Sequence, residues 1–178
     1  MRIISGMRRG MKLKAPEGLD TRPTTDRVKE SVFNIIQFQL PAQCVLDLFA
    51  GSGALGLEAL SRGSDSCVFV ESGRQAAALI KENIQNTRFQ DRAHLLNSDA
   101  ISFLEHTAEV FDLIFLDPPY NKGLLAPVLD IVRRRALLSP DGIIVVETEQ
   151  AGEPVPEIYP VRKVAVYGKT VITILQNS

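Results

Sequence analysis

The stretch between residues 43 and 147 alternates short apolar runs with segments of helical periodicity, and this alternation restricts the possible folds more than any other feature of the chain. Five runs have the length and apolar character of buried strands: residues 44–49, 67–71, 93–97, 111–117 and 142–147. Four segments between them carry apolar residues at the spacing of a helix face: residues 54–62, 74–86, 100–106 and 124–137. Strands joined to helices by short loops favour βαβ crossovers, so the sequence predicts an α/β fold with a mostly parallel sheet and helices on both faces.

The two ends of the chain depart from this alternation. Residues 158–166 and 170–176 alternate apolar and other side chains around Tyr167-Gly168-Lys169, which predicts an antiparallel hairpin that closes the sheet. Residues 23–39 combine cap-type residues with apolar residues at helical spacing and predict an amphipathic helix. The remaining residues, 1–22, form a basic arm whose first 15 residues we expect to be extended or a hairpin. We expect one domain, residues 1–178, with its core at residues 43–178.

Composition excludes several classes of protein. A chain of 178 residues with 45% hydrophobic residues and a net charge of −1 is not typical of a disordered protein. Two cysteines are too few for a disulfide scaffold, and no apolar run approaches the length of a membrane span. The N-terminus lacks the apolar region of a signal peptide, so we expect a cytoplasmic protein without a membrane partner.

The charge is distributed unevenly along the chain. Residues 1–40 contain eight Lys or Arg and four Asp or Glu, whereas the rest of the chain is acidic. A basic arm on an acidic body favours a polyanionic partner, because each Lys or Arg can neutralise one phosphate. A solvated basic surface without a partner explains this pattern equally well. If the arm binds RNA, the candidate residues are Arg2, Arg8, Arg9 and Lys12.

A glycine-rich motif follows the first predicted strand. Residues 51–56 read GSGALG, a GxGxxG sequence that ends a strand and opens a helix. Glycines at these positions let the backbone approach a ligand closely, and the helix N-terminus offers free N–H groups. Glu71 lies 20 residues after Gly51, at the end of the next strand, where a carboxylate can accept both hydroxyls of a ribose. The pattern indicates a nucleotide cofactor; a turn needed only for close packing is the alternative.

Asp47 decides which nucleotide fits better. It lies within the first strand, ahead of the glycines, where the cofactor would enter. An aspartate repels a pyrophosphate but attracts a cationic amino-acid group. S-adenosylmethionine carries an ammonium and a sulfonium and has no phosphate, so we predict it in preference to NAD. Asp99 follows the third strand and can accept from the adenine amino group, or cap the helix that begins near Ala100.

The fourth predicted strand delivers a second motif, Asp117-Pro118-Pro119-Tyr120. Open α/β sheets bind ligands at the carboxyl ends of their strands. Asp117 and the Pro118 carbonyl can together accept both hydrogens of an amino group, and Tyr120 can stack on the ring that bears it. Such hydrogen bonds draw the amine nitrogen towards tetrahedral geometry and free its lone pair to attack a methyl group. A stiff Pro-Pro turn after a core strand is the alternative.

These motifs resemble a known family. Asp-Pro-Pro-Tyr is the signature of amino-group methyltransferases that use S-adenosylmethionine. Three further segments narrow the resemblance to the RsmD-type guanine-N2 methyltransferases of small-subunit rRNA: residues 1–6 with Arg9-Gly10, residues 22–30 (RPTTDRVKE) and residues 167–170. The resemblance spans the chain from residue 1 to Thr170. It implies a seven-stranded Rossmann-like fold and methylation of one guanine of 16S rRNA, within the 30S subunit or an assembly intermediate.

The resemblance also implies roles for individual residues. Asp117, Pro118, Pro119 and Tyr120 would hold the target guanine as catalytic residues. The cofactor would be bound by residues of four segments: Thr24 and Arg27; Asp47, Phe49, Gly51 and Gly53; Glu71; and Asp99 with Ala100.

Other functions stay open at this point. A DNA adenine-N6 methyltransferase shares the tetrapeptide, but the chain has no obvious insertion for DNA recognition. A glutamine-N5 methyltransferase would typically carry Asn in place of Asp117. A non-catalytic RNA-binding module on a methyltransferase scaffold is a third possibility. His94 and His106 lack metal-ligand spacing, so we predict no metal, and we expect no obligate protein partner.

Overall fold

The computed structural model describes residues 1–15, 26–119, 122–152 and 154–177. These residues form a seven-stranded sheet in the order β3-β2-β1-β4-β5-β7-β6. Its strands are β1 (Cys44–Leu48), β2 (Ser66–Val70), β3 (Ala93–Leu96), β4 (Phe111–Leu116), β5 (Leu138–Glu149), β6 (Val161–Tyr167) and β7 (Thr170–Gln176). The strands from β3 to β5 are parallel, and β7 is antiparallel to both of its neighbours, β5 and β6. The predicted α/β sheet with a closing antiparallel hairpin is confirmed.

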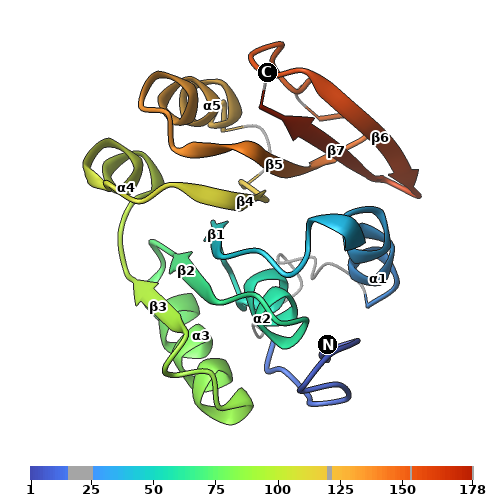
Figure 1. Ribbon diagram of the computed structural model, residues 1–178, viewed down its shortest axis with the longest axis vertical. Helices are drawn as coiled ribbons and strands as arrows, with labels where there is room; N and C mark the ends of the chain where they lie inside the picture. Colours follow the sequence, from blue (N-terminus) through green and yellow to red (C-terminus); the bar gives the residue numbers. More distant parts are fainter. Residues whose placement is uncertain (16–25, 120–121, 153, 178) are drawn as a thin grey trace.

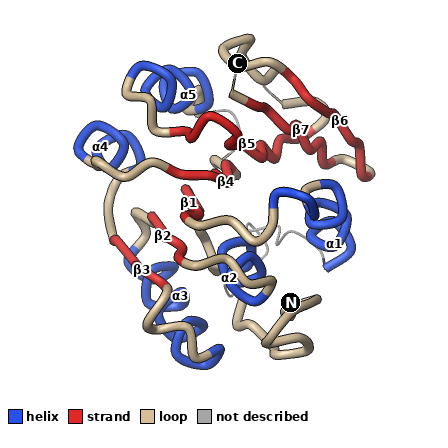
Figure 2. Tube along the Cα trace, in the orientation of Figure 1, coloured by secondary structure: helices blue, strands red, loops and turns tan. Residues whose placement is uncertain are grey.

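Helices cover both faces of this sheet (Figures 1 and 2). One face, here called the α1 face, carries α1 (Asp26–Ile35), α2 (Ala54–Ser61) and α3 (Arg74–Thr87). The other, the α5 face, carries α4 (Ala100–His106) and α5 (Leu125–Arg134). Each face has its own apolar core, because successive side chains of a strand point to opposite sides. Among the described residues, none of the helices is both long enough and apolar enough to cross a bilayer.

The chain changes direction across the sheet at β1. From β1 it proceeds outward to β2 and β3, and it then returns to pair β4 with the opposite side of β1. In open α/β sheets, ligands bind at such a reversal, outside the carboxyl ends of the strands. The carboxyl ends of β1 and β4 carry the two motifs singled out in the sequence.

Several predicted boundaries differ from the structure: β5 begins at Leu138 instead of residue 142, and β6 begins at Val161 instead of residue 158. The helix expected to reach residue 137 ends at Arg134, because Ala136 adopts a left-handed conformation with φ of 52°. The Leu137 N–H then closes the helix end on the Val132 carbonyl at 2.9 Å, and Leu138 begins β5 opposite Phe111. The helix expected over residues 23–39 comprises α1 and a short 3₁₀ helix, η1 (Gln37–Gln39); residues 23–25 lie outside the described residues.

The first 15 residues form a hairpin, which confirms one of the two conformations expected for them. The Ile3 N–H donates to the Met11 carbonyl at 2.9 Å, and the Leu13 N–H donates to the Met1 carbonyl at 3.0 Å. Ile3 and Leu13 are buried in the core of the α1 face. We call residues 1–15 the N-terminal hairpin; it packs beside α2 (Figure 1).

A buried ion pair fixes this hairpin to α2. Lys29 of α1 and Glu58 of α2 are both fully buried, with 3.5 Å between Nζ and Oε2. Glu58 also accepts the backbone N–H groups of Ile4 at 2.7 Å and Ser5 at 3.0 Å, and the Arg62 Nε–H at 2.9 Å. Burial lowers the pKa of Lys29, and the Glu58 carboxylate opposes that shift. The carboxylate therefore joins two helices and the hairpin in one network.

Gly6 makes the close approach of the hairpin to α2 possible. Its φ is +82°, and a Cβ added there would lie 1.8 Å from the Ser61 carbonyl oxygen. The neighbouring Met7 N–H donates to that same oxygen at 2.7 Å. Only glycine combines this backbone conformation with this contact.

Replacing Glu58 by Ala tests this network. Removal of one partner of a buried ion pair leaves an unpaired buried charge, so we expect a loss of about 3–5 kcal/mol in the free energy of unfolding. The amides of Ile4 and Ser5 should also exchange faster in hydrogen exchange, because they lose their acceptor. Glu82→Ala, which breaks the exposed pair with Lys14, is the control and should lose about 1 kcal/mol or less. Equal losses in the two variants would contradict the role given to Glu58.

Candidate active site

The turn after β1 forms the first part of the site. Phe49, Gly51 and Gly53 have φ angles of 67°, 56° and 76°, all in the left-handed region that favours glycine. Gly53 immediately precedes α2, so the turn ends at a helix N-terminus with free N–H groups. Gly53 also packs closely, because a Cβ there would lie 3.3 Å from Ile80 and 3.4 Å from Phe69. The motif thus serves tight packing as well as close access to the backbone.

Asp47 of β1 lies below this turn and is 3% exposed. Its Oδ2 accepts the Gly56 N–H at 2.9 Å. Burial raises the pKa of Asp47 to about 7, and the Glu71 carboxylate adds to the increase, while the hydrogen bond from Gly56 opposes it. A cation beside a buried carboxylate stabilises its ionised form further.

Glu71 connects the ends of β1 and β2. Its Oε2 accepts the Gly51 N–H at 2.9 Å, and its Oε1 accepts the Gly73 N–H at 2.8 Å. Each carboxylate oxygen has a second lone pair that can accept from a ligand hydroxyl. The structure therefore brings Glu71 directly beside the glycine turn.

Asp99 lies at the end of the next connection outward. Its side chain accepts the Ser102 N–H at 2.9 Å and caps α4, which confirms the capping role considered for it. The preceding Ser98 N–H donates to the Glu71 carbonyl at 3.2 Å, and Ala100 is buried. The ends of β1, β2 and β3 thus bring the glycine turn, Glu71 and Asp99 to one edge of the sheet.

Asp117 and the two prolines follow β4 on the other side of β1. Asp117 is half-buried, Pro118 is buried and Pro119 is exposed. Burial and the nearby Glu147 and Asp47 carboxylates raise the pKa of Asp117 well above its usual range. Tyr120, the last residue of the motif, lies outside the described residues.

Glu147 of β5 is the residue of this region that the sequence interpretation missed. Leu116 pairs with Val146, so Asp117 and Glu147 follow in register on adjacent strands. The apolar side chains two residues before them, Phe115 and Val145, belong to the core of the α1 face, so both carboxyl groups point to that face. An acidic residue directly after an apolar run was the available signal.

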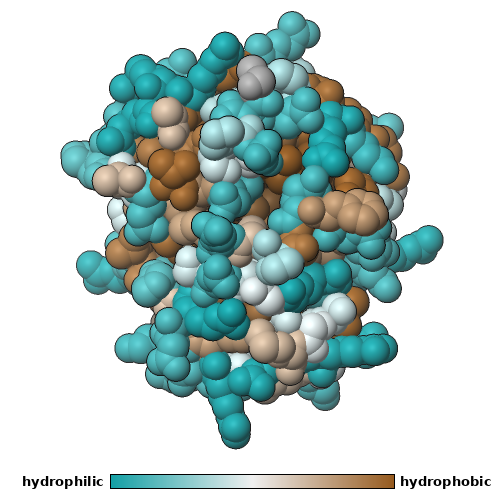
Figure 3. All heavy atoms as spheres, in the orientation of Figure 1, coloured by the Kyte–Doolittle hydropathy of each residue, from teal (hydrophilic) through white to brown (hydrophobic). Residues whose placement is uncertain are grey.

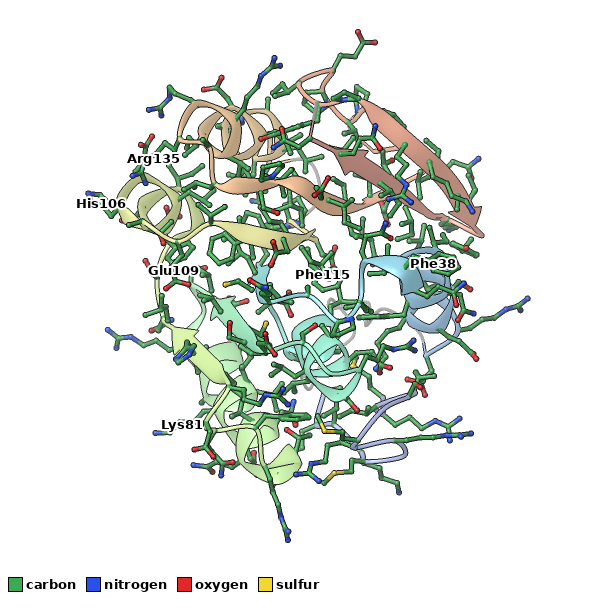
Figure 4. The ribbon with its side chains drawn as sticks, in the orientation of Figure 1. Phe38, Lys81, His106, Glu109, Phe115 and Arg135 are labelled. Carbon is green, nitrogen blue, oxygen red and sulfur yellow. The ribbon has the colours of Figure 1, made fainter. Side chains whose placement is uncertain are left out.

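Three carboxyl groups thus share one face of three adjacent strands. Asp47 pairs with Phe115, which places it one side-chain row deeper than Asp117 and Glu147. Phe115, labelled in Figure 4, points to the same face as Asp47. Its ring packs against Phe33 of α1, with 5.7 Å between ring centroids. The arrangement attracts cations and hydrogen-bond donors and repels phosphate.

Asn83 of α3 links the glycine turn to the N-terminal hairpin, and it too was missed. It is fully buried, and its Nδ2 donates to the carbonyls of Ser52 and Lys14, both at 2.9 Å. Its Oδ1 accepts the Lys14 N–H at 2.8 Å. Spacing in the sequence gave no sign of this junction, because it joins three segments far apart in the chain.

The basic candidates of the hairpin occupy different environments. Arg9 and Lys12 are exposed. Arg2 is exposed and pairs with Asp26, at 3.4 Å between Nε and Oδ2. Arg8 is half-buried: its Nε donates to the Thr87 carbonyl at 2.8 Å, and its guanidinium lies 5.6 Å from the centroid of Phe89. Arg8 therefore attaches the hairpin to the end of α3. Of the four candidates, Arg9 and Lys12 have side chains that are exposed and form no ion pair with another described residue.

Two cofactor-binding candidates precede β1 in the chain. Arg27 lies in the first turn of α1 and is exposed, while Thr24 lies outside the described residues. Within the described ranges, no group of three or more His, Cys, Asp or Glu residues is arranged to hold a metal ion. On the surface, hydrophilic side chains cover most of the face visible in Figure 3, with apolar patches between them.

The chain is similar over nearly its whole length to proteins that are named as methyltransferases. The model of the family described as "Conserved hypothetical protein 95" matches residues 1–176. The chain is 41% identical to the "Putative rRNA methyltransferase YlbH" of Bacillus subtilis, over 99% of each protein. It is 37% identical to the "Ribosomal RNA small subunit methyltransferase D" of Escherichia coli, over 99% of this chain and 90% of the other. The solved structure of the "Putative methyltransferase yhhF from Escherichia coli" superimposes with a TM-score of 0.86 at 38% identity, covering 100% of this chain and 98% of the other.

The raised pKa of Asp47 predicts a specific dependence of stability on pH. The pKa of an aspartate in an unfolded chain is about 3.9, whereas burial raises the pKa of Asp47 in the folded protein to about 7. The folded state thus holds this proton more tightly, and the associated stability is lost as the pH rises from about 4 to about 7. Asn at this position stays neutral and avoids that loss.

We therefore expect the Tm of Asp47→Asn, relative to the Tm of the unsubstituted protein, to increase between about pH 5 and pH 8 in thermal unfolding without ligand. Asp65→Asn, in an exposed loop, is the control and should show no such trend. A Tm difference for Asp47→Asn that does not change with pH would contradict the burial of this charge.

Proposed function

The chain belongs to the RsmD-type family of ribosomal RNA small-subunit methyltransferases, and we propose that it methylates the exocyclic N2 amine of one guanine in 16S rRNA with S-adenosylmethionine as methyl donor. The observation that carries the proposal is the position of Asp117 and Pro118 at the carboxyl end of β4, next to the glycine turn of β1. We further propose that it acts as a single-domain cytoplasmic enzyme, on the 30S subunit or an assembly intermediate and without an obligate protein partner.

The residues at the edge of the sheet fit S-adenosylmethionine. When bound, it supplies a methyl group on a sulfonium and leaves as a neutral, stable thioether. Asp47, whose buried carboxylate accepts the Gly56 N–H, favours the cationic amino-acid end. Glu71 offers lone pairs to the ribose hydroxyls, and Asp99 with Ala100 lies where the adenine would meet the ends of β2 and β3. Carboxyl groups in place of phosphate-binding cations favour this cofactor over a dinucleotide.

Asp117 and the Pro118 carbonyl orient the target amine. By accepting both hydrogens of N2, they draw its lone pair out of conjugation with the guanine ring and aim it at the methyl carbon. Asp117 then stabilises the positive charge that develops on N2 as the N–C bond forms and the S–C bond breaks. The surplus proton leaves N2 for water. Orientation of this kind contributes up to about 7–11 kcal/mol in well-aligned intramolecular reactions.

The N-terminal hairpin provides a surface for the RNA backbone. Arg9 and Lys12 project from it into solvent, and Asn83 connects the same hairpin to the glycine turn. Contacts to phosphates position a protein on RNA without specifying sequence. We propose that this hairpin holds the rRNA while the end of β4 receives the base.

Replacing Asp117 by Ala tests the catalytic assignment. The variant should bind S-adenosylhomocysteine with unchanged affinity, because Asp47 and Glu71 remain, while methyl transfer to small subunits that lack the modification falls by about 10²–10³-fold. Calorimetry measures the first quantity, and incorporation of labelled methyl groups measures the second. Full turnover in this variant would refute the role of Asp117.

The double substitution Arg9→Gln and Lys12→Gln tests the RNA surface. Each lost phosphate contact lowers the slope of log K against log salt by about 0.7–0.9, so the slope should decrease by about 1.4–1.8. Lys81→Gln, an exposed lysine of α3 outside the hairpin, controls for net charge. An unchanged slope in the double variant would remove the hairpin from the RNA interface.

A further inference from the structure

Glu147 lies beside Asp117 at the place where the target base would enter. It is 7% exposed, one residue after Val146 on β5, and Val146 pairs with Leu116 of β4. Adjacent parallel strands lie about 4.8 Å apart, so the two carboxyl groups are neighbours on the α1 face. The contribution of Glu147 to the raised pKa of Asp117 agrees with this proximity.

Asp47, the third carboxyl group, does not share this position. It pairs with Phe115, two residues before Asp117, and its Oδ2 accepts the Gly56 N–H at 2.9 Å. Asp47 therefore lies farther from the carboxyl ends of the strands, below the glycine turn. Asp117 and Glu147 lie nearer to those ends, side by side.

Two neighbouring carboxyl groups suit one edge of guanine in particular. Guanine carries two adjacent donors on its Watson–Crick edge, the N2 amine and the N1–H. Adenine, by contrast, presents an amine next to N1, which is an acceptor. An ionised carboxylate has only acceptor lone pairs, so it can bond the N1–H of guanine but repels the N1 lone pair of adenine.

We propose that Glu147 is a specificity-determining residue that accepts the N1–H of the target guanine while Asp117 holds the N2 amine. This inference rests on the proposed function and identifies the side chain that distinguishes guanine from purines lacking a proton on N1. A site built to bond one group of a substrate rejects analogues that lack that group.

The test uses an rRNA substrate whose target guanosine is replaced by 2,6-diaminopurine riboside. This analogue keeps the 2-amine but has an unprotonated N1. The unsubstituted enzyme should prefer guanosine by about 10–100-fold in kcat/KM, the range expected for one hydrogen bond to a charged group. Glu147→Gln should reduce that preference to about threefold or less, because an amide can either accept from N1–H or donate to N1.

Two further variants control for loss of structure. Glu147→Asp retains a carboxylate and should retain the preference for guanosine, even where its turnover is lower. Glu105→Gln makes the same chemical change on α4, on the other face of the sheet, and should leave the preference unchanged. A Glu147→Gln variant with the preference of the unsubstituted enzyme would overturn the proposal.

A measurement of RNA binding distinguishes a failure of the role proposed for Glu147 from a failure of the proposed methyl transfer. The Kd values of the guanosine and diaminopurine RNAs, measured with S-adenosylhomocysteine present, should differ for the unsubstituted protein and converge for Glu147→Gln. A lack of methyl transfer to any rRNA would contradict the proposed function, while the ratio of Kd values would still decide the role of Glu147. Equal ratios in the two proteins would refute that role, whatever the activity.

Discussion

Three carboxyl groups on one face of adjacent strands are the constraint around which the rest of the molecule is built. Asp47, Asp117 and Glu147 are held close together in surroundings that exclude much of the water, and their mutual repulsion and burial oppose folding. The backbone hydrogen bond from the Gly56 N–H to Asp47 offsets part of this cost. The two apolar cores on the faces of the sheet stabilise the arrangement, and cationic ligands and hydrogen-bond donors would relieve it. A ligand that brings a positive charge or hydrogen-bond donors is therefore favoured beside these carboxyl groups.

The N-terminal hairpin is connected to this site by buried polar groups rather than by the sheet. Glu58 holds the hairpin to α2, whose first turn follows the glycine motif. Asn83 joins the carbonyl of Ser52, inside that motif, to the backbone of Lys14. Buried polar networks rigidify the segments that they connect, provided that their hydrogen bonds are satisfied. Through these contacts, the surface proposed to bind RNA and the turn proposed to bind the cofactor share one rigid framework.

Much of this architecture could be predicted from the sequence because it follows from local patterns. Apolar runs and helical spacing located the strands and most helix ends, and GSGALG and Asp117-Pro118-Pro119 marked two strand ends that the sheet brings together. The end of α5 was predicted wrongly, since Ala136 adopts a left-handed conformation for which alanine gives no signal. Glu58, Asn83 and Glu147 were missed because their roles depend on partners distant in the chain. The contact of Arg8 with the Thr87 carbonyl is likewise defined only by the fold.

The most direct test of this account is the identity of the nucleoside that the protein methylates. Small ribosomal subunits from cells lacking the enzyme are incubated with the protein and labelled S-adenosylmethionine, alongside naked rRNA, duplex DNA and a protein extract. The digested products are then separated and identified by mass spectrometry. We predict label in N2-methylguanosine from the subunits. Label in adenine or in protein, or no label in any substrate despite tight binding of S-adenosylhomocysteine, would contradict it.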